Sequence, residues 1–417
     1  MTERPLRFCH ITTFYPPYSF GGDAVYVQQL AYALAERGHH VEVIHCLDSY
    51  NLLAHDGELR QSTDHPNVIV HRLKSRAGAL SPLATQQTGS PFFKREQIEK
   101  ILARGFDVVH YHNISLVGGP KVLELRAPSP EAGNTAVKLY STHEYWLVCP
   151  MHVLFRYDGV ACTEKKCLRC TLANKRPPQW WRYTPMLQNA LKHLDMIIYA
   201  NNFTRAQHRT LGYEPPHAFL PYFHMAMPEP KSTEHAAADK PYFVSVGRLE
   251  PLKGVHTLIP FFREYERARL VVVGDGSQRG ELEELAESSP NIEFTGWQDH
   301  TQISGLLRHA TALVLPSLCF ESGPLVMLEA ALQRTPIIGR AIGSIPDLIE
   351  SIAGGFTFHD DVSLRAALDR LLDAPGEREA IGARAYAAYR RHFTPEAHLS
   401  KYRDIIQEAH DKRQNRT

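Results

Sequence analysis

One stretch, residues 313–332, constrains the fold of this chain more than any other. Residues 313–315 form a short apolar run, which favours a parallel strand buried on both faces. The residues after the next loop are apolar nearly all round a helical wheel, which indicates a buried helix. Ser322 is suited to cap that helix, and Pro324 to stand in its first turn. The stretch therefore predicts a strand–loop–helix unit of an α/β domain.

Two carboxylates interrupt this apolar stretch. Glu321 lies in the loop before the helix, where outward-pointing backbone N–H groups favour anions. Glu329 lies within the helix, where a carboxylate is costly unless a hydrogen bond satisfies it. Carboxylates suit hydroxyl groups and an N–H cradle suits phosphate, so the combination indicates a sugar nucleotide. The alternative is an ordinary strand–helix unit with a surface glutamate, which we disfavour because buried unpaired carboxylates are rare.

A second segment places two cations after a predicted strand. Residues 242–246 are expected to form the strand, and Arg248 and Lys253 follow it in the segments Gly-Arg-Leu and Lys-Gly. Two cations at the carboxyl end of a strand can neutralise a diphosphate, both when it is bound and when it leaves. On residue type alone they can equally be surface residues.

The spacing of Glu321 and Glu329, with seven residues between them and Ala330 following, resembles the donor-binding signature of the retaining family-4 glycosyltransferases. The segments around Arg248 and Lys253 are similar to the same family, and the resemblance extends over nearly the whole chain. It implies two doubly wound, Rossmann-like α/β domains that face each other across a cleft, the GT-B arrangement.

The resemblance also implies roles at the donor site. Glu321 and the amides of residues 322–325 hold the sugar, Glu329 holds the ribose, and Arg248 and Lys253 stabilise the leaving diphosphate. Gln298 follows a strand expected at residues 292–294, in a turn that faces the nucleobase. The predicted donor-binding set in the second half is Arg248, Lys253, Gln298, Glu321, Ser322, Gly323, Pro324, Leu325 and Glu329.

The first half opens with a strand, a helix and a strand, expected at residues 6–12, 24–37 and 41–46. Gly21 and Gly22 precede the helix, where glycine lets a ligand approach the backbone. Two glycines in a loop are more often only a turn, but the family places a similar loop against the donor phosphates and the acceptor. Residues 48–66 and 75–95 are polar or rich in Ser, Gly, Thr and Pro, and we expect loops there.

Two further strands, expected at residues 106–112 and 137–142, end in polar side chains. Ligands of open α/β sheets lie at the carboxyl ends of strands, so these side chains are candidates for the floor of a cleft. They are His110, His112, Asn113, Thr142, His143 and Glu144.

His143 is the strongest of these candidates. The segment from Thr142 to Trp146 resembles the family's His-Asp segment on the acceptor side, with Glu144 where Asp is more usual. We predict His143 as a catalytic residue together with Glu321, Arg248 and Lys253. A histidine at a strand end is also often a packing or hydrogen-bonding residue.

Four of the seven cysteines fall in an insert at about residues 149–183. Four thiolates suit structural Zn²⁺, and one pair has the C-x-x-C spacing. A redox motif is less favoured, because this C-x-x-C does not open a helix after a strand. Free thiols in a loop are the remaining alternative. The predicted metal ligands are Cys149, Cys162, Cys167 and Cys170.

A basic and aromatic stretch overlaps the end of this insert. It contains no acidic residue between Lys165 and Lys192. A solvated face with aromatic anchors explains it, and so does a site for a phosphorylated or lipid-linked acceptor or for a membrane surface. The residues concerned are Lys165, Lys166, Arg169, Lys175, Arg176, Trp180, Trp181, Arg182, Tyr183 and Lys192.

Composition places limits on the class of protein. A length of 417 residues predicts more than one domain, and a net charge of +1 gives no general argument for nucleic acid. Residues 1–7 are polar, and no apolar run is long enough for a bilayer. We therefore expect a cytoplasmic protein with reduced cysteines, either free in the cytoplasm or peripheral at the inner face of the membrane.

The expected domains are an acceptor-side domain at residues 1–225, a linker at 226–240, a nucleotide-sugar domain at 241–392, and a helix at 393–417 that returns to the first domain. The predicted activity is retaining transfer of a sugar from a UDP- or GDP-sugar to a sugar, lipid-linked or small-molecule acceptor in glycan biosynthesis. No metal is required for that chemistry, because the cations balance the charge. Two alternatives are a nucleotide-sugar 2-epimerase and a non-catalytic two-lobed sugar-binding protein.

Overall fold

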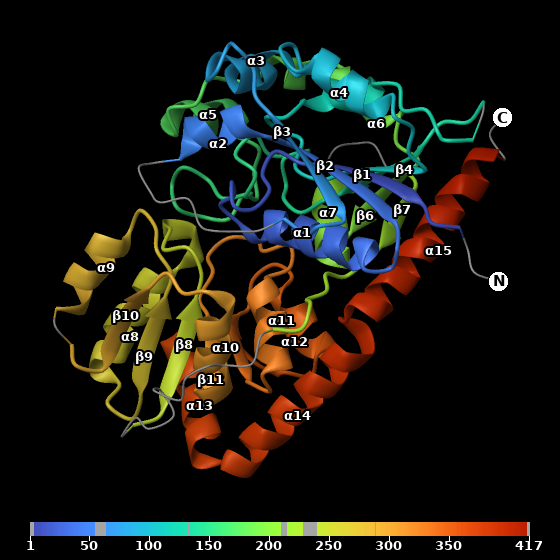
Figure 1. Cartoon of the computed structure of the whole chain (residues 1–417). Helices are drawn as coiled ribbons and strands as arrows, with labels where there is room; N and C mark the ends of the chain where they lie inside the picture. Colours follow the sequence, from blue (N-terminus) through green and yellow to red (C-terminus); the bar gives the residue numbers. More distant parts are fainter. Residues whose placement is uncertain are drawn as a thin grey trace. The chain divides into compact units, whose positions relative to one another are not determined.

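The computed structural model describes residues 4–54, 64–131, 133–209, 215–227, 240–287 and 289–414 (Figure 1). The chain divides into two compact units. Unit 1 comprises Met1–His152, Lys166–Tyr222 and His398–Thr417, and unit 2 comprises Val153–Lys165 and Phe223–Ala397. The middle of the cysteine insert therefore groups with unit 2. Residues 228–239 of the expected linker lie outside the described residues.

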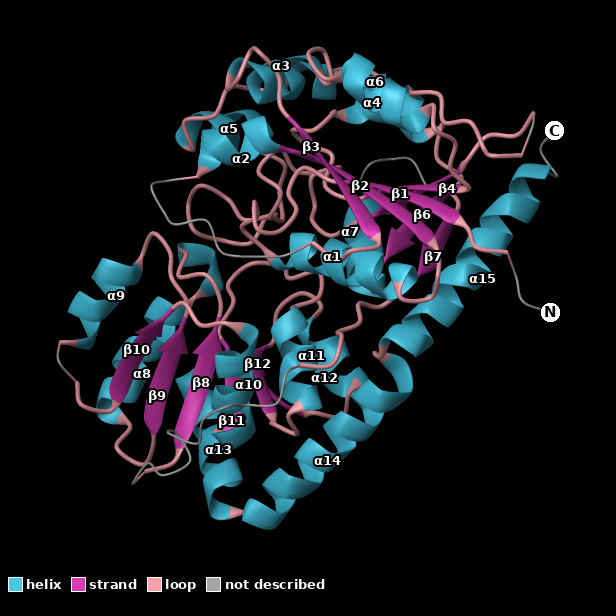
Figure 2. Cartoon of the chain, in the orientation of Figure 1, coloured by secondary structure: helices cyan, strands magenta, loops and turns pink. Residues whose placement is uncertain are grey.

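Unit 1 is built on a seven-stranded sheet in the order β3-β2-β1-β4-β5-β6-β7, and every recorded pairing is parallel (Figure 2). Its central strands are buried on both faces, as expected for apolar runs in a parallel sheet. The strands are β1 (Arg7–Ile11), β2 (His40–Cys46), β3 (Val68–Leu73), β4 (Val108–Tyr111), β5 (Val137–Ser141), β6 (Met196–Tyr199) and β7 (His217–Phe219).

The α-helices and 3₁₀ helices (η) described in unit 1 connect these strands. They are α1 (Gly22–Ala35), α2 (Leu47–Leu53), α3 (Leu80–Thr88), α4 (Arg95–Leu102), η1 (Pro120–Glu124), α5 (Cys167–Ala173), η2 (Trp180–Tyr183), α6 (Met186–Leu191) and α7 (Asn202–His208). The expectation of loops at 48–66 and 75–95 is wrong in part, because α2 and α3 lie there. The Cys46 sulfur caps α2 by accepting from the Ser49 N–H, and Gly89 ends α3 in the left-handed region at φ 66°.

Unit 2 repeats the architecture with six parallel strands in the order β10-β9-β8-β11-β12-β13. The strands are β8 (Tyr242–Val246), β9 (Arg269–Val273), β10 (Ile292–Gly296), β11 (Ala312–Leu315), β12 (Ile337–Arg340) and β13 (Gly355–Phe358). The helices are η5 (Pro251–Lys253), η6 (Val255–Thr257), α8 (Leu258–Glu264), α9 (Arg279–Ala286), α10 (His300–His309), α11 (Leu325–Leu332), α12 (Ile345–Ser351), α13 (Asp361–Asp373) and α14 (Pro375–His392).

Each sheet has one point where the strand order reverses. In unit 1 the point lies between β1 and β4, and in unit 2 between β8 and β11. The loops leaving two such strands turn to opposite faces of the sheet, which opens a crevice at their carboxyl ends. The predicted two doubly wound, Rossmann-like sheets are confirmed, and the topology marks one candidate ligand position in each unit.

The last helix, α15 (Pro395–Gln414), begins at the end of unit 2 and belongs to unit 1 from His398 onward. Tyr402 is buried, and its hydroxyl lies 2.8 Å from Nδ1 of His110 on β4. Near the end of the helix, the Arg413 guanidinium donates to the Thr135 and Ala136 carbonyls, at 2.6 Å each. The helix is therefore an integral part of unit 1.

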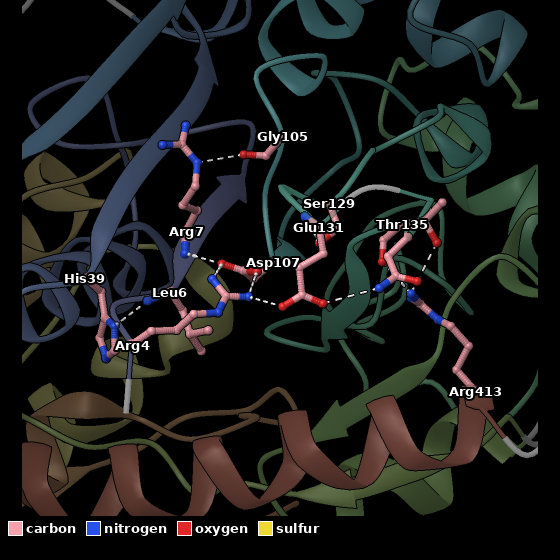
Figure 3. Close-up of polar contacts among 11 residues, drawn as sticks. Arg4, Leu6, Arg7, His39, Gly105, Asp107, Ser129, Glu131, Thr135 and Arg413 are labelled. Carbon is pink, nitrogen blue, oxygen red and sulfur yellow. Dashed lines mark hydrogen bonds and ion pairs between the residues drawn. The ribbon is translucent and has the colours of Figure 1, made fainter. Parts of the chain in front are cut away.

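Arginine side chains also fix the start of the chain to unit 1 (Figure 3). Asp107 accepts from the Arg7 backbone N–H and from the Arg4 guanidinium, both at 2.8 Å. Arg4 reaches Glu131 as well, at 2.9 Å. These contacts hold β1 beside the loop that precedes β4.

None of the helices in the described ranges combines the length and apolar character that crossing a membrane requires.

Candidate functional site

A pocket lies at the point where the strand order of unit 2 reverses. Its walls come from the ends of β8 and β11, from the loop after β8 and from the loop before α11. Strand order thus brings together residues about 70 positions apart in sequence, as the topology predicts. The polar and charged residues among its lining are Ser245, Arg248, Lys253, Ser317 and Glu321.

Glu321 and Lys253 form an ion pair in this pocket. The Lys253 ammonium lies 2.6 Å from Oε1 of Glu321, and the Ser317 hydroxyl donates to the same oxygen at 2.7 Å. Burial opposes both charges, but the attraction between them prevails: the pKa of Glu321 is held below its ordinary value, and the pKa of Lys253 is raised. Both groups are therefore charged at neutral pH, and the carboxylate is fixed in place.

Two close backbone contacts shape this pocket. Gly254 has φ +74°, and a Cβ placed on it would lie 2.1 Å from the Pro316 carbonyl oxygen. A Cβ on Gly274 would lie 1.9 Å from the Gly247 oxygen. Only glycine permits such approaches, so these two residues let the loop that carries Arg248 and Lys253 lie against the ends of β11 and β9.

The entry to α11 differs from the sequence prediction. The helix starts at Leu325 with Pro324 as its N-cap and with no side-chain cap, so the prediction that Ser322 caps it is wrong. Proline has no N–H, so Pro324 cannot contribute an amide to the cradle expected at residues 322–325. The Ser344 hydroxyl, which donates to the Glu321 carbonyl at 2.7 Å, helps to hold the loop instead.

Glu329 lies in α11 outside the lining of this pocket, and it has two histidine neighbours. Oε1 of Glu329 is 3.1 Å from Nε2 of His224 and 3.7 Å from Nδ1 of His300. His224 and Glu329 are both buried. Burial opposes charge on either group, but their pairing raises the pKa of His224 and lowers the pKa of Glu329. The predicted buried carboxylate is thus satisfied by a partner 105 residues away.

His224 is held at both ring nitrogens and through its backbone. Nδ1 lies 2.6 Å from the Met225 carbonyl oxygen, which can only accept, so Nδ1 carries a proton. The other nitrogen faces the Glu329 carboxylate, which the lowered pKa keeps ionised. Two acceptors at two ring nitrogens therefore select the imidazolium form. The backbone of His224 is bound by Phe393 and by the Tyr389 hydroxyl, which donates to its carbonyl at 2.9 Å.

Three other residues predicted to bind the donor, Gln298, Gly21 and Gly22, do not line the pocket in unit 2. The Gln298 amide donates to the Thr295 carbonyl at 3.0 Å and stays within its own turn. Gly21 is the N-cap of α1 with extended backbone, and Gly22 is the first residue of that helix. Both glycines belong to unit 1, as His143 does, whereas the ion pair and Glu329 belong to unit 2.

His143 is part of a buried histidine chain at the reversal point of unit 1. Nε2 of His143 lies 2.8 Å from Nδ1 of His112, whose Nε2 lies 3.1 Å from Nδ1 of His10. Nδ1 of His143 lies 2.9 Å from the Tyr222 hydroxyl. Burial lowers the pKa of His143 to about 3, so its ring is neutral at physiological pH. This geometry makes His143 a fixed hydrogen-bonding group and gives no evidence that it takes up a proton.

None of the four cysteines of the insert forms a disulfide. Cys167 opens α5, and no strand leads directly into that helix, so the C-x-x-C does not open a helix after a strand, as expected. In the described ranges, potential ligand atoms gather in two sets, His10 with His110 and His112, and His224 with His300 and Glu329. Neither set includes a cysteine, so the zinc site remains a prediction.

Sequence reasoning missed several residues that these contacts now single out. Ser317 is the second residue after β11, and its position near a strand end could have been a signal. His224 and His300 gave no local signal, because their partner Glu329 is distant in sequence. They become recognisable only through the tertiary contacts.

Family models match both halves of the chain. The one described as glycosyltransferase family 4 matches residues 20–219, and the one described as glycosyl transferases group 1 matches residues 228–388. The curated relatives include a lipopolysaccharide core biosynthesis glycosyltransferase, LpsD, of Rhizobium meliloti, which is 31% identical over 50% of this chain and 62% of its own length. A glycogen synthase of Mycobacterium tuberculosis is 36% identical over 33% of this chain and 36% of its own length. The chain thus spans less than two thirds of these two relatives.

Other matches extend over nearly the full length. An uncharacterized glycosyltransferase of Methanocaldococcus jannaschii is 25% identical over 90% of this chain and 91% of its own length. Among solved structures, sucrose-phosphate synthase from Thermosynechococcus elongatus superposes with a TM-score of 0.73 at 20% identity, covering 98% of this chain and 100% of the other. That likeness shows the GT-B fold. With a family model matching each half, the chain belongs to the family-4 glycosyltransferases.

Proposed function

We propose that this protein transfers a sugar from a nucleotide-diphosphate sugar to a hydroxyl acceptor, in the synthesis of a glycan, polysaccharide or glycoconjugate. The observation that carries the proposal is the Lys253–Glu321 ion pair, with Arg248 beside it, in the pocket between β8 and β11. The pair offers a cation for a diphosphate and a carboxylate for sugar hydroxyls within one small site. Family membership supports the same activity.

The proposed chemistry uses the charges of the chain itself. When the bond between the sugar and the diphosphate breaks, negative charge grows on the leaving diphosphate. Lys253 and Arg248 stabilise that charge, so no metal ion is needed for the step. Glu321 accepts hydrogen bonds from the sugar hydroxyls and orients the anomeric carbon, while Glu329 accepts from the ribose hydroxyls.

We further propose that the anomeric configuration is retained. We assign no carboxylate of unit 1 as the nucleophile of a double displacement: Glu144 is paired with His152 at 2.5 Å, and Asp23 accepts from the Asn113 amide at 3.4 Å. Front-face transfer, in which the leaving diphosphate takes the acceptor proton, needs no such group. The donor is proposed to be a UDP- or GDP-sugar. HepE from Anabaena, which has a similar fold, has been solved in complex with UDP and glucose and with UDP-glucose.

A panel of UDP-, GDP- and ADP-sugars tests the donor assignment. We expect one base to raise the melting temperature at concentrations at which the other two do not. Incubation of that donor without acceptor should leave its sugar unchanged, as read by NMR of the recovered nucleotide sugar. A changed sugar without acceptor would identify a 2-epimerase instead. Binding with neither transfer nor epimerisation across an acceptor panel would favour the non-catalytic binding protein.

The zinc site is proposed separately, for Cys149, Cys162, Cys167 and Cys170. Thiolates are soft ligands that suit Zn²⁺, and the insert has little apolar sequence to order itself. We expect elemental analysis of protein purified without added metal to give close to one zinc per chain. Substitution of Cys167 by serine should remove it and leave donor binding in unit 2 intact. No zinc, with all four thiols reactive in the native protein, would end the proposal.

A further inference from the structure

Four exposed aromatic side chains gather on adjoining segments of unit 1. Phe92 and Phe93 follow α3, and Trp180 and Tyr183 belong to η2; we call these four residues the aromatic face. The exposed fractions are 70% for Phe92, 61% for Trp180 and 64% for Tyr183. Among the described residues only two other Phe, Trp or Tyr side chains are comparably exposed, Phe219 and Trp297. Exposed apolar groups that cluster in this way mark an interaction surface.

Buried contacts hold the two segments together. The Trp181 indole N–H donates to the Gln86 carbonyl of α3 at 2.8 Å. The Arg182 guanidinium lies over the rings of Trp181 and Trp146, at 4.6 Å and 5.1 Å from their centroids. Trp181 and Arg182 are therefore structural, which corrects their inclusion in a solvated basic and aromatic face.

This anchoring explains why the aromatic face stays exposed. Residues three apart eclipse each other on a 3₁₀ helix, so Trp180 and Tyr183 share one side of η2. Their ring centroids are 6.1 Å apart, and those of Phe92 and Phe93 are 5.0 Å apart. Leu80 on α3 is 64% exposed as well. The side chains cannot turn inward, because Trp181 already fills the interior position.

Positive charge lies next to the aromatic face along the chain. Lys175 and Arg176 are exposed and stand five and four residues before Trp180. Arg169 and Lys166 are exposed on α5 and just before it, with Leu168 and Leu172 exposed on the same helix. The acidic residues nearest to Phe93 in sequence are on α4: Glu96 is exposed, and Glu99 is paired with Arg95 at 2.9 Å. Aromatic rings beside lysine and arginine match the interface of an anionic bilayer.

We propose that the aromatic face binds the surface of an anionic phospholipid membrane. Phe92, Phe93 and Trp180 would enter the boundary between headgroups and acyl chains, and Lys175 and Arg176 would contact lipid phosphates. Aromatic insertion and electrostatic attraction supply the two signals that stable peripheral binding requires. A second copy of the chain is a less suitable occupant, because the adjoining basic residues would repel their own copies.

Vesicle co-sedimentation tests this proposal with the intact protein. We expect binding to vesicles containing phosphatidylglycerol and little binding to phosphatidylcholine alone, with the affinity falling as salt concentration rises. Substituting Phe92 and Trp180 together by serine should weaken binding by at least about tenfold, since each ring loses its burial in the interface. Lys175→Glu with Arg176→Glu should abolish the preference for anionic vesicles.

The matched control replaces two exposed apolar residues elsewhere, Phe219→Ser with Val362→Ser, and should bind vesicles as the wild type does. Melting temperature and nucleotide affinity should be equal in all variants, because unit 2 holds the donor site. Failure of the wild type to bind either vesicle would overturn the proposal. So would equal loss in the control pair, or a concentration-dependent dimer that the aromatic substitutions abolish.

Discussion

Replacing Lys253 with alanine is expected to lower kcat by roughly 10²–10³-fold while changing the donor KM far less. The ammonium lies 2.6 Å from Glu321 and lines the pocket with Arg248. Charge on the diphosphate increases as the glycosidic bond breaks, so a cation beside it stabilises the transition state more than the bound donor. Steady-state kinetics with the donor identified by the nucleotide panel measures both parameters.

The single substitution also leaves the Glu321 carboxylate without its counter-ion. Adding Glu321→Gln to the Lys253→Ala variant removes that charge. The double variant therefore separates the effect of losing the Lys253 ammonium from the effect of leaving the Glu321 carboxylate unpaired. Lys240→Ala, an exposed lysine whose recorded contact is with the Glu266 carbonyl, is the control and should retain full kcat. A KM effect without a change in kcat would rule out the assigned role.

Glu329→Gln is expected to weaken donor binding by roughly 1.5–3 kcal/mol, or about 10- to 150-fold in Kd. Glutamine keeps the size of the side chain but loses the ionised acceptor for the ribose hydroxyls. Isothermal titration calorimetry with the nucleoside diphosphate measures the change. Unaltered affinity would show that the ribose lies elsewhere.

The same site predicts how donor affinity depends on pH. The pKa of Glu329 is lowered, so its charge is lost only as pH falls through that depressed value. The pKa of His224 is raised, so the imidazolium is complete below the ordinary histidine value and is lost as pH rises through the raised one. The Glu329–His224 ion pair is therefore intact at pH values between the lowered pKa of Glu329 and the raised pKa of His224. The other ionisable groups that face it are His300 and Tyr389.

We expect His224→Gln to weaken donor binding at neutral pH and to remove the decline in affinity that the wild type shows above the raised pKa of His224. A merely structural role for His224 would lower affinity without altering the shape of the pH profile. His309→Gln, an exposed histidine at the end of α10, is the matched control. Calorimetry across pH, with the melting temperature recorded at each point, separates loss of affinity from loss of fold.

The strands were the most predictable part of the fold. Residues 41–46 and 242–246 were predicted as strands; they are β2, which begins one residue earlier, and β8, which has the same bounds. They are apolar runs flanked by turn residues, so the local signal suffices. Helices α2 and α3 escaped prediction, because their stability depends on a sulfur cap and on packing against neighbouring helices rather than on an apolar period.

In the candidate site, too, the residues that follow a local sequence pattern were predicted, and those defined by tertiary contacts were not. Glu321, Glu329, Arg248 and Lys253 were found because their spacing follows a family pattern. The side-chain partners of the two carboxylates were not found: His224 meets Glu329 only through the tertiary structure, and Ser317 was not recognised as a partner of Glu321. A lone histidine in a segment without regular structure carries no sign that it will meet a carboxylate 105 residues later.

The assignment of residues 398–414 to unit 1 has a consequence for biosynthesis of the protein. A nascent chain emerges from the ribosome with its N-terminus first, and contiguous domains can fold as they emerge. Here the strands of the first sheet are all synthesised by Phe219, yet Tyr402, Ile405 and Ala409 are buried components of the same unit. Their binding surface on unit 1 stays uncovered while unit 2 is translated. The first sheet to be made is therefore the last to be completed, and that interval is when chaperones would be needed most.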